Sequence, residues 1–254
     1  MRKQSPKKFQ KKAPEKPQDP VRLNKFIANA GICSRREADK LIEQGKIKVN
    51  GKVVTTLGVK VGPKDKVLFQ GKPLTPEKPI YVLLNKPKDF ITTTDDPQGR
   101  RTVMELVKTA GHQRIYPVGR LDRMTTGLLL LTNDGDLAKK LSHPSGEVKK
   151  LYEVVLDKPI TDDDYLKVED GIKLEDGIAK PDEIAIVSQD RKHLGIQIHI
   201  GWNRVIRRIF ESIGYEVTKL DRVMYANLTK HDLPRGKWRY LSEKEVIKLK
   251  YLNF

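Results

Sequence analysis

A short loop between two apolar segments organises this sequence: residues 116–135 read YPVGRLDRMTTGLLLLTNDG. The loop carries one carboxylate, Asp122, between Arg120 and Arg123. A positive charge nearby can lower a carboxyl pKa by ~1–3 units, so we expect Asp122 to stay ionised. An ionised carboxylate suits nucleophilic attack better than proton donation. Asp122 is therefore the candidate catalytic residue.

The positive charge of the chain is concentrated near its beginning. The formal net charge is +17 and the isoelectric point is about 9.7. Residues 1–20 hold seven Lys or Arg against two acids, residues 21–70 hold eleven against four, and the rest hold 32 against 27. The first 70 residues thus carry +12 of the +17. This uneven distribution indicates a polyanionic partner, and nucleic acid fits best.

The composition excludes several classes of protein. A length of 254 residues suggests two domains. The single cysteine, Cys33, rules out a disulfide framework or a cysteine metal site within the chain, and the five histidines show no metal-ligand spacing. No apolar run approaches the ~18 residues of a membrane span, and the basic N-terminus lacks the apolar core of a secretory signal. We expect a cytoplasmic protein with no metal and no membrane partner.

The first 70 residues divide into a tail and a compact unit. Residues 1–20 are rich in Lys, Pro and Gln, so we expect a disordered basic tail. Residues 21–70 follow as two helices and a hairpin. Ser34 and Glu37 form a capping-box pattern that begins the second helix, and Asn50-Gly51 predicts the hairpin turn.

The remaining chain predicts an α+β domain. A proline-containing linker covers residues 71–79, and the larger domain covers residues 80–254. Its apolar runs predict strands at 81–84, 114–118, 127–131, 151–156 and 195–200. Its amphipathic segments predict helices near 101–110, 136–142, 161–169 and 204–213. Strands and helices interleave without a regular βαβ repeat, which favours α+β with a mixed sheet.

Other chemistries of a carboxylate near RNA lack their required partners. Retaining glycoside hydrolysis needs a second carboxyl about 5 Å away. Asp134 and Asp136 are the nearest candidates, but turn formation and helix capping explain both. Phosphoryl transfer and RNA methylation each need a glycine-rich loop, which the sequence lacks, and it shows no acidic or histidine cluster for metal-dependent cleavage.

Residues 21–68 resemble the S4 RNA-binding domain. The resemblance is carried by the segments at 22–28, 31–38 and 47–51, which read RLNKFIA, GICSRREA and IKVNG. It implies a small α-L-like fold that grips structured RNA. The residues it offers for RNA binding are Arg22, Lys25, Ser34, Arg35, Arg36, Lys46 and Lys48.

Nearly the whole chain resembles the pseudouridine synthases that act on ribosomal RNA, in the branch that covers both subunits. The motifs are GRLD at 119–122, TGLLLLTNDG at 126–135, NKP at 85–87, SHPS at 142–145, KLY at 150–152 and NRVIRR at 203–208. Related sequences often carry Gln where this chain has Val205. The resemblance implies isomerisation of a uridine without cofactor or metal, and its large-subunit members match the C-terminal segments best.

The resemblance also assigns candidate roles. The essential aspartate of the family maps onto Asp122, its tyrosine onto Tyr152 and its basic partner of the aspartate onto Arg207. An aromatic platform can return ~1–3 kcal/mol to an unstacked base, which suits Tyr152. In a regular helix over 204–213, Arg207 lies at the edge of the buried arc and can reach Asp122. Candidate RNA contacts in this domain are Lys86, Arg120, Arg204 and Arg208.

Several alternatives stay open from the sequence. The carboxylate can attack C1′ of the ribose, add to the uracil or remove a 2′ proton. We expect the target to be a uridine in a loop of large-subunit ribosomal RNA, with small-subunit RNA as the alternative, presented as naked RNA or as a pre-ribosomal particle. A non-catalytic ribosome-assembly factor with an S4 domain and an RNA N-glycosylase that releases the base are the rival functions. We expect the protein to act as a monomer.

Overall fold

The computed structural model describes residues 19–143 and 147–252, and the chain divides into two compact units after Glu77. The predicted disordered tail falls almost entirely on residues 1–18, which lie outside the described residues. Each unit has its own hydrophobic core, and each is described by itself below.

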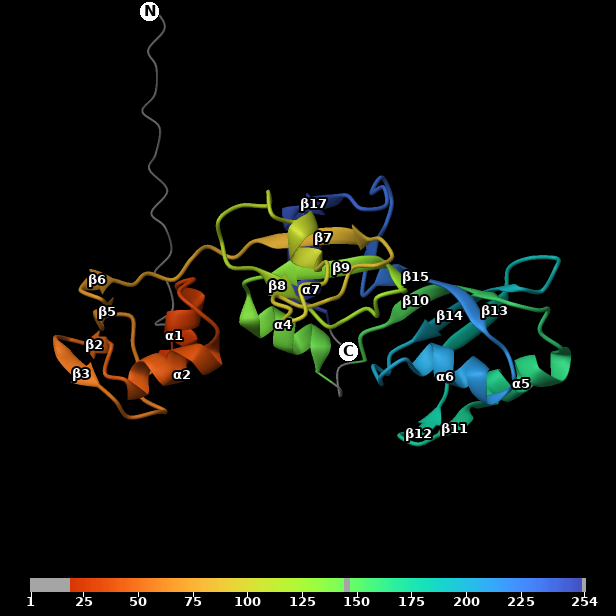
Figure 1. Cartoon of the computed structure of the whole chain (residues 1–254), viewed down its shortest axis with the longest axis horizontal. Helices are drawn as coiled ribbons and strands as arrows, with labels where there is room; N and C mark the ends of the chain where they lie inside the picture. Colours follow the sequence, from red (N-terminus) through yellow and green to blue (C-terminus); the bar gives the residue numbers. More distant parts are fainter. Residues whose placement is uncertain (1–18, 144–146, 253–254) are drawn as a thin grey trace, which may run out of the picture. The chain divides into compact units, whose positions relative to one another are not determined.

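The first unit contains two helices and a small antiparallel sheet (Figure 1). Helix α1 spans Leu23–Asn29 and α2 spans Arg35–Glu43. The sheet has the order β3-β2-β5-β6, with β2 at Ile47–Val49, β3 at Lys52–Val54, β5 at Val67–Phe69 and β6 at Lys72–Pro73. A second, two-stranded sheet pairs β1 (Val21–Arg22) with β4 (Lys60–Val61). The helix–helix–hairpin prediction is confirmed.

Local sequence signals explain the boundaries of these elements. The Ser34 hydroxyl accepts a hydrogen bond from the Glu37 amide at 3.2 Å, and the Glu37 carboxylate accepts one from the Ser34 amide at 2.8 Å. This reciprocal pair is the predicted capping box that begins α2. Asn50 and Gly51 both have positive φ, 51° and 83°, as the two-residue turn between β2 and β3 requires.

Part of the segment that we expected to be a linker belongs to the first unit. Strand β6 pairs with β5, and the amide of Glu77 donates to the carbonyl of Asn29 at 2.8 Å. Pro73 is tolerated in β6 because β6 is an edge strand, where a missing amide donor costs little. Only residues 78–79 separate Glu77 from the region that we assigned to the second domain.

The second unit is built on one mixed sheet with the order β13-β14-β10-β15-β9-β7-β17 (Figure 1). Its strands are β7 (Tyr81–Lys86), β9 (Thr126–Thr132), β10 (Lys150–Leu156), β13 (Glu183–Ile186), β14 (His193–Ile198), β15 (Val217–Tyr225) and β17 (Trp238–Tyr240). Short strands β8 (Tyr116–Pro117) and β16 (Leu228–Thr229) pair with β9 and β15. The β15–β9 pair is parallel and the others are antiparallel. This mixed sheet confirms the α+β prediction.

Helices cover the sheet in separate groups. They are α3 (Val103–Leu106), α4 (Gly135–Ser142), α5 (Asp162–Asp170), α6 (Val205–Ser212) and α7 (Glu243–Lys250), and the hairpin of β11 (Ile172–Leu174) with β12 (Gly177–Ala179) accompanies α5 and α6 (Figure 1). Helix α3 is shorter than predicted: Val103, Val107 and Ala110 are buried at helical spacing, but residues beyond Leu106 continue as turns.

The central strands are apolar throughout because both of their faces are covered. Leu128 and Leu130 of β9 pack with α4 and α7, whereas Leu129 and Leu131 pack with α3 on the opposite face. In the other half of the sheet, α5 and α6 cover the face that carries Val154 and Leu220. Packed cores on the sheet therefore support strands β9, β10 and β15 and the loop that precedes β9.

Candidate active site

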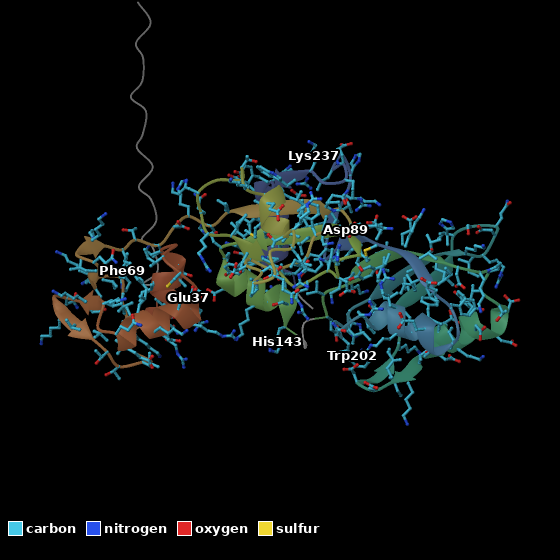
Figure 2. The ribbon with its side chains drawn as sticks, in the orientation of Figure 1. Glu37, Phe69, Asp89, His143, Trp202 and Lys237 are labelled. Atoms are coloured by element: carbon cyan, nitrogen blue, oxygen red, sulfur yellow. The ribbon has the colours of Figure 1, made fainter. Side chains whose placement is uncertain are left out.

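A pocket in the second unit gathers the loop before β9, strands β10 and β15, and the segment before α6. It is lined by Arg120, Leu121, Asp122, Thr125, Lys150, Tyr152, Ile198, Ile200, Gly201, Trp202, Asn203, Arg204, Val205, Ile206, Leu220 and Arg222. Trp202 is labelled in Figure 2. The pocket thus brings together Asp122 and Tyr152, two residues 30 positions apart in the sequence.

The Asp122 carboxylate is left available while its backbone is fixed. Among the described residues, no side chain forms a hydrogen bond or an ion pair with this carboxylate. The amide of Thr125 donates to the Asp122 carbonyl at 3.1 Å, closing a turn. The Thr92 hydroxyl donates to the carbonyl of the preceding Leu121 at 2.8 Å. The loop therefore presents the carboxylate to the pocket without occupying it.

Lys86 holds the same loop from within, so its predicted contact with RNA is wrong. It is 0% exposed, at the end of β7. Its Nζ donates to the carbonyls of Pro87, Asp122, Arg123 and Thr125 at 2.8–3.2 Å. Burial lowers the pKa of Lys86 to about 8, although the negative charges of Asp122 and Asp89 oppose this shift. A lysine enclosed in this way positions the loop and cannot reach a phosphate.

The two arginines beside Asp122 have different surroundings. Arg120 is exposed and lines the pocket, which keeps it as a predicted RNA contact. Arg123 forms an ion pair with Asp89 at 3.0 Å, and both side chains are more than half exposed. Asp89 is labelled in Figure 2. The sequence left the role of Arg123 open, and the structure directs its guanidinium to Asp89.

Tyr152 lies on the strand that forms one wall of the pocket. In β10 its Cα pairs with Ile196 of β14 and with Arg222 of β15. The ring is half-buried. It packs against the core cluster that contains Val154 and Leu220 and against the cluster that contains Leu129 and Leu131. A ring that is fixed on one side and open to a pocket on the other can stack on a base.

Arg207 is near Asp122 without contacting it. Its NH1 donates to the carbonyl of Val217 at 2.7 Å, and among the described residues no ion pair within 4.0 Å joins it to Asp122. Burial and the charge of Arg204 lower the pKa of Arg207, and the negative charge of Asp122 opposes them. The direct pair with Asp122 that we expected is thus absent from the described residues.

Four apolar residues form the buried arc of α6, and its outer arginines differ from each other. Val205, Ile206, Ile209 and Phe210 are buried. Arg204 is exposed, lines the pocket and donates to Glu211 at 3.0 Å. Arg208 does not point freely outward, because its guanidinium forms an ion pair with Asp176 beside the β11–β12 hairpin and its side chain is 25% exposed.

The cations predicted to bind RNA in the first unit lie mostly at its surface. Arg22, Arg35, Arg36, Lys46 and Lys48 are exposed, and Lys25 is half-buried. Ser34 serves as the cap of α2. Glu37, the partner of Ser34, is labelled in Figure 2. These side chains remain predictions as RNA contacts.

Asp134 has the structural role that we predicted, and Trp238 packs in the core region. The Asp134 carboxylate caps α4 by accepting from the Leu137 amide at 3.1 Å, and it also accepts from the Tyr81 hydroxyl at 2.7 Å. Trp238 packs beside the core and meets the Tyr240 ring edge-on at 5.2 Å. In the described ranges no group of three or more His, Cys, Asp or Glu is arranged to hold a metal ion.

Comparison with known proteins gives consistent matches over both units. A family model described as RNA pseudouridylate synthase matches residues 80–212, and the S4 domain model matches residues 21–67. The chain is 48% identical over 236 residues to the ribosomal large subunit pseudouridine synthase B of Bacillus subtilis (strain 168), covering 91% of this chain and 96% of that protein. It is 38% identical over 240 residues to the dual-specificity RNA pseudouridine synthase RluF of Escherichia coli (strain K12), covering 92% and 79%.

A solved structure extends the match to three dimensions. The crystal structure of a pseudouridylate synthase superposes with a TM-score of 0.63 at 30% identity, covering 90% of this chain and 99% of that one. The mixed sheet, its pocket and the S4 unit together define an isomerase that acts on RNA. The chain belongs to the RNA pseudouridine synthase family. No helix within the described ranges has the length and apolar character needed to cross a membrane.

Proposed function

We propose that this protein converts a uridine of large-subunit ribosomal RNA to pseudouridine, with Asp122 as the acting carboxylate. One observation carries the proposal: the Asp122 carboxylate, which has no partner among the described residues, lies in the same pocket as Tyr152. The relative of 48% identity is named for the large ribosomal subunit, which favours that RNA as the substrate.

The chemistry requires a base outside its stack and a carboxylate beside the ribose. The reaction breaks the bond between N1 and C1′, turns the uracil and joins C5 to C1′. N1 gains a proton and C5 loses one, so the isomerisation needs no oxidant or reductant. Asp122 attacks C1′, adds to the uracil or removes a 2′ proton. Tyr152 supplies the stacking surface for the extruded base.

The cations around the pocket divide into two groups by exposure. Arg120 and Arg204 are exposed and line the pocket, where they can bind the phosphates that flank the target uridine. Arg207 is half-buried and stabilises the negative charge of Asp122 from a distance. Exposed cations of the S4 unit bind RNA outside the pocket and contribute affinity.

The setting of the reaction follows from the proposed substrate. Ribosomal RNA, alone or in a pre-ribosomal particle, is the partner, and the reaction takes place in the cytoplasm, where ribosomes are assembled. The protein acts as a monomer in this proposal.

Mapping pseudouridines tests this proposal. The purified protein is incubated with large-subunit and small-subunit ribosomal RNA transcripts, and ribosomal RNA from cells with and without the gene is compared. We expect a pseudouridine that depends on the protein in large-subunit RNA in both experiments. A modification confined to small-subunit RNA would change the assigned target. Release of free uracil with an abasic site would indicate a glycosylase, and unmodified RNA throughout would indicate a non-catalytic assembly factor.

A further inference from the structure

Arg222 is a buried cation in the wall of the pocket with most of its donors unused. It lies on β15, is 3% exposed, and lines the pocket with Asp122 and Tyr152. Its Nε donates to the carbonyl of Leu128 at 2.8 Å, and its guanidinium lies 4.6 Å from the centre of the Tyr225 ring. Its NH2 is buried without a partner among the described residues. A buried donor left unpaired costs ~1–3 kcal/mol, so this arrangement indicates a missing acceptor.

A second unpaired polar group lies in the same pocket. Thr125 is 2% exposed, lines the pocket, and its Oγ1 is buried without a hydrogen-bond partner in the described residues. It immediately precedes β9, whose Gly127 pairs with Arg222 across the parallel strands. Buried polar groups without partners are rare in folded proteins. Two of them on residues of one pocket indicate a polar ligand.

The charge near Arg222 is also unbalanced. Lys150 lines the pocket on the same face of β10 as Tyr152, and its Nζ donates to the carbonyl of His199. Burial and the positive charge of Arg222 lower the pKa of Lys150 to about 8, although the negative charge of Asp182 opposes this shift. In the described part of the chain, neither cation forms an ion pair. A buried cation with a second, partly buried cation near it favours a ligand that carries or develops negative charge.

The depth of Arg222 distinguishes a base from a phosphate. An extruded nucleotide enters a pocket base first, while its phosphates stay with the chain at the surface. Arg120 and Arg204 are exposed, as phosphate contacts require, whereas Arg222 is 3% exposed. The Cα atoms of Arg222 and Tyr152 pair directly in the sheet, so the guanidinium lies next to the proposed stacking surface.

We propose that Arg222 donates a hydrogen bond to a carbonyl oxygen of the extruded uracil. The inference rests on the proposed function and deepens it. When the bond between N1 and C1′ breaks with its electrons remaining on the base, the negative charge spreads to the carbonyl oxygens. A guanidinium fixed by Leu128 and Tyr225 is oriented before this charge forms, and a donor so placed stabilises the transition state more than the ground state. The Thr125 hydroxyl supplies a further hydrogen bond to the same base.

Exchanging oxygen for sulfur in the target base tests the contact. The experiment uses the full chain and a transcript containing the mapped uridine, or 2-thiouridine or 4-thiouridine in its place, under single-turnover conditions with saturating protein. The variants are Arg222→Gln, Arg222→Lys and the control Lys219→Gln, an exposed residue on the same strand. Circular dichroism melting of every variant reports its fold.

We expect Arg222→Gln to slow pseudouridine formation about 100-fold while the Kd for RNA changes less than about threefold. Arg222→Lys retains more activity than Arg222→Gln, and Lys219→Gln stays within about twofold of the wild type. One thio substitution slows the wild type and adds no further slowing in Arg222→Gln, because the contact is already lost. If Arg222→Gln does not fold, the same comparison is made in Arg222→Lys, where we expect that thio effect to shrink.

Three outcomes would overturn the proposal. Equal thio effects in wild type and variant at both positions would mean that Arg222 does not contact a carbonyl oxygen. A weaker Kd together with a salt slope reduced by about 0.7–0.9 would identify a phosphate contact instead. Unchanged rates in Arg222→Gln would remove the role altogether. If the wild type forms no pseudouridine, it is the proposed function that fails.

Discussion

The Nζ of Lys86 donates to the main-chain carbonyl of Asp122 at 3.1 Å from a position that is 0% exposed. The same ammonium binds the carbonyls of Pro87, Arg123 and Thr125. The buried ammonium of Lys86 thus holds the main chain of the candidate catalytic loop through these hydrogen bonds. Strand β7 therefore holds the candidate catalytic loop in place, although its side chains are buried.

Replacing Lys86 should release the loop. In Lys86→Met four carbonyls lose their donor, so we expect the free energy of unfolding to fall by about 1–3 kcal/mol and turnover to fall about 100-fold. Urea unfolding and single-turnover assays measure the two effects. Lys88→Met, an exposed neighbour, is the control and should change neither by much. Full activity in folded Lys86→Met would show that the loop does not depend on this ammonium.

The pH dependence of turnover should report the same ammonium. Burial lowers the pKa of Lys86 to about 8, so the group loses its charge and one N–H as the pH rises through that value. We expect activity to fall above about pH 8, and Lys86→Arg to move this fall upward because a guanidinium stays charged. Lys150 also has its pKa lowered to about 8, so Lys150→Arg is measured in parallel. If neither variant shifts the pH at which activity falls, Lys86 does not cause that fall.

Asp221 should stabilise the fold at neutral pH and cease to do so in acid. Burial would raise its pKa, but hydrogen bonds from Arg235, Lys230 and Thr126 outweigh burial and lower the pKa to about 2. Because this folded value lies below the ordinary 3.8, the stabilisation is present above about pH 4 and is lost as the pH falls toward 2. It amounts to about 2 kcal/mol. Chemical unfolding of the wild type between pH 6 and pH 2 should show the free energy of unfolding fall by this amount. Asp221→Asn should show no such fall.

Gly127 should tolerate no side chain. Its φ is 106°, and a Cβ would lie 2.3 Å from the carbonyl oxygen of Arg222 across the parallel pair of β9 and β15. We expect Gly127→Ala to lower the free energy of unfolding by more than about 2 kcal/mol. Gly214 also has positive φ, 83°, but has open space around it, so Gly214→Ala should cost only about 1–2 kcal/mol. Equal costs would show that backbone strain, and not the close strand pairing, governs Gly127.

The S4 unit should contribute salt-dependent affinity. Arg35 and Arg36 are exposed at the start of α2. If both bind phosphates, the double variant Arg35→Gln/Arg36→Gln lowers the slope of log K against log salt by up to about 1.8 on duplex RNA. Filter binding at several salt concentrations measures this slope. The matched double variant Lys244→Gln/Lys248→Gln on α7 should leave it unchanged, and an unchanged slope in the arginine variant would remove these residues from the RNA interface.

The sequence predicts most elements here because local signals decide them. The capping box of Ser34, the turn at Asn50-Gly51 and the apolar run at 195–200 are each signals within a few residues. The continuous apolar run of β9 indicates a strand buried on both faces. The length of α3 was overestimated because buried turns after Leu106 preserve helical spacing.

The burial and contacts of the residues around the site could not be predicted from local sequence signals. Lys86 is followed by Pro87 and exposed Lys88, so nothing nearby in the sequence marks it as enclosed, and only the fold brings the Asp122 loop around it. Arg222 was missed for a similar reason. Arg222 lies two residues after Leu220 on β15, so both side chains point to the buried face of the strand. A charged residue at such a buried position is the one signal that could have identified it. Asp122 was found because its motif is local.

The conversion of Asp122 to Asn tests the central claim most directly. The substitution keeps the shape of the side chain and removes its charge, and the carboxylate has no structural partner among the described residues. Asp163→Asn, at an exposed position in the first turn of α5, is the control. Pseudouridine formation in ribosomal RNA is measured with the Kd for the same RNA. We predict that Asp122→Asn forms no pseudouridine and binds RNA within a few-fold of the wild type, whereas Asp163→Asn is fully active. Continued turnover by purified Asp122→Asn would contradict the account.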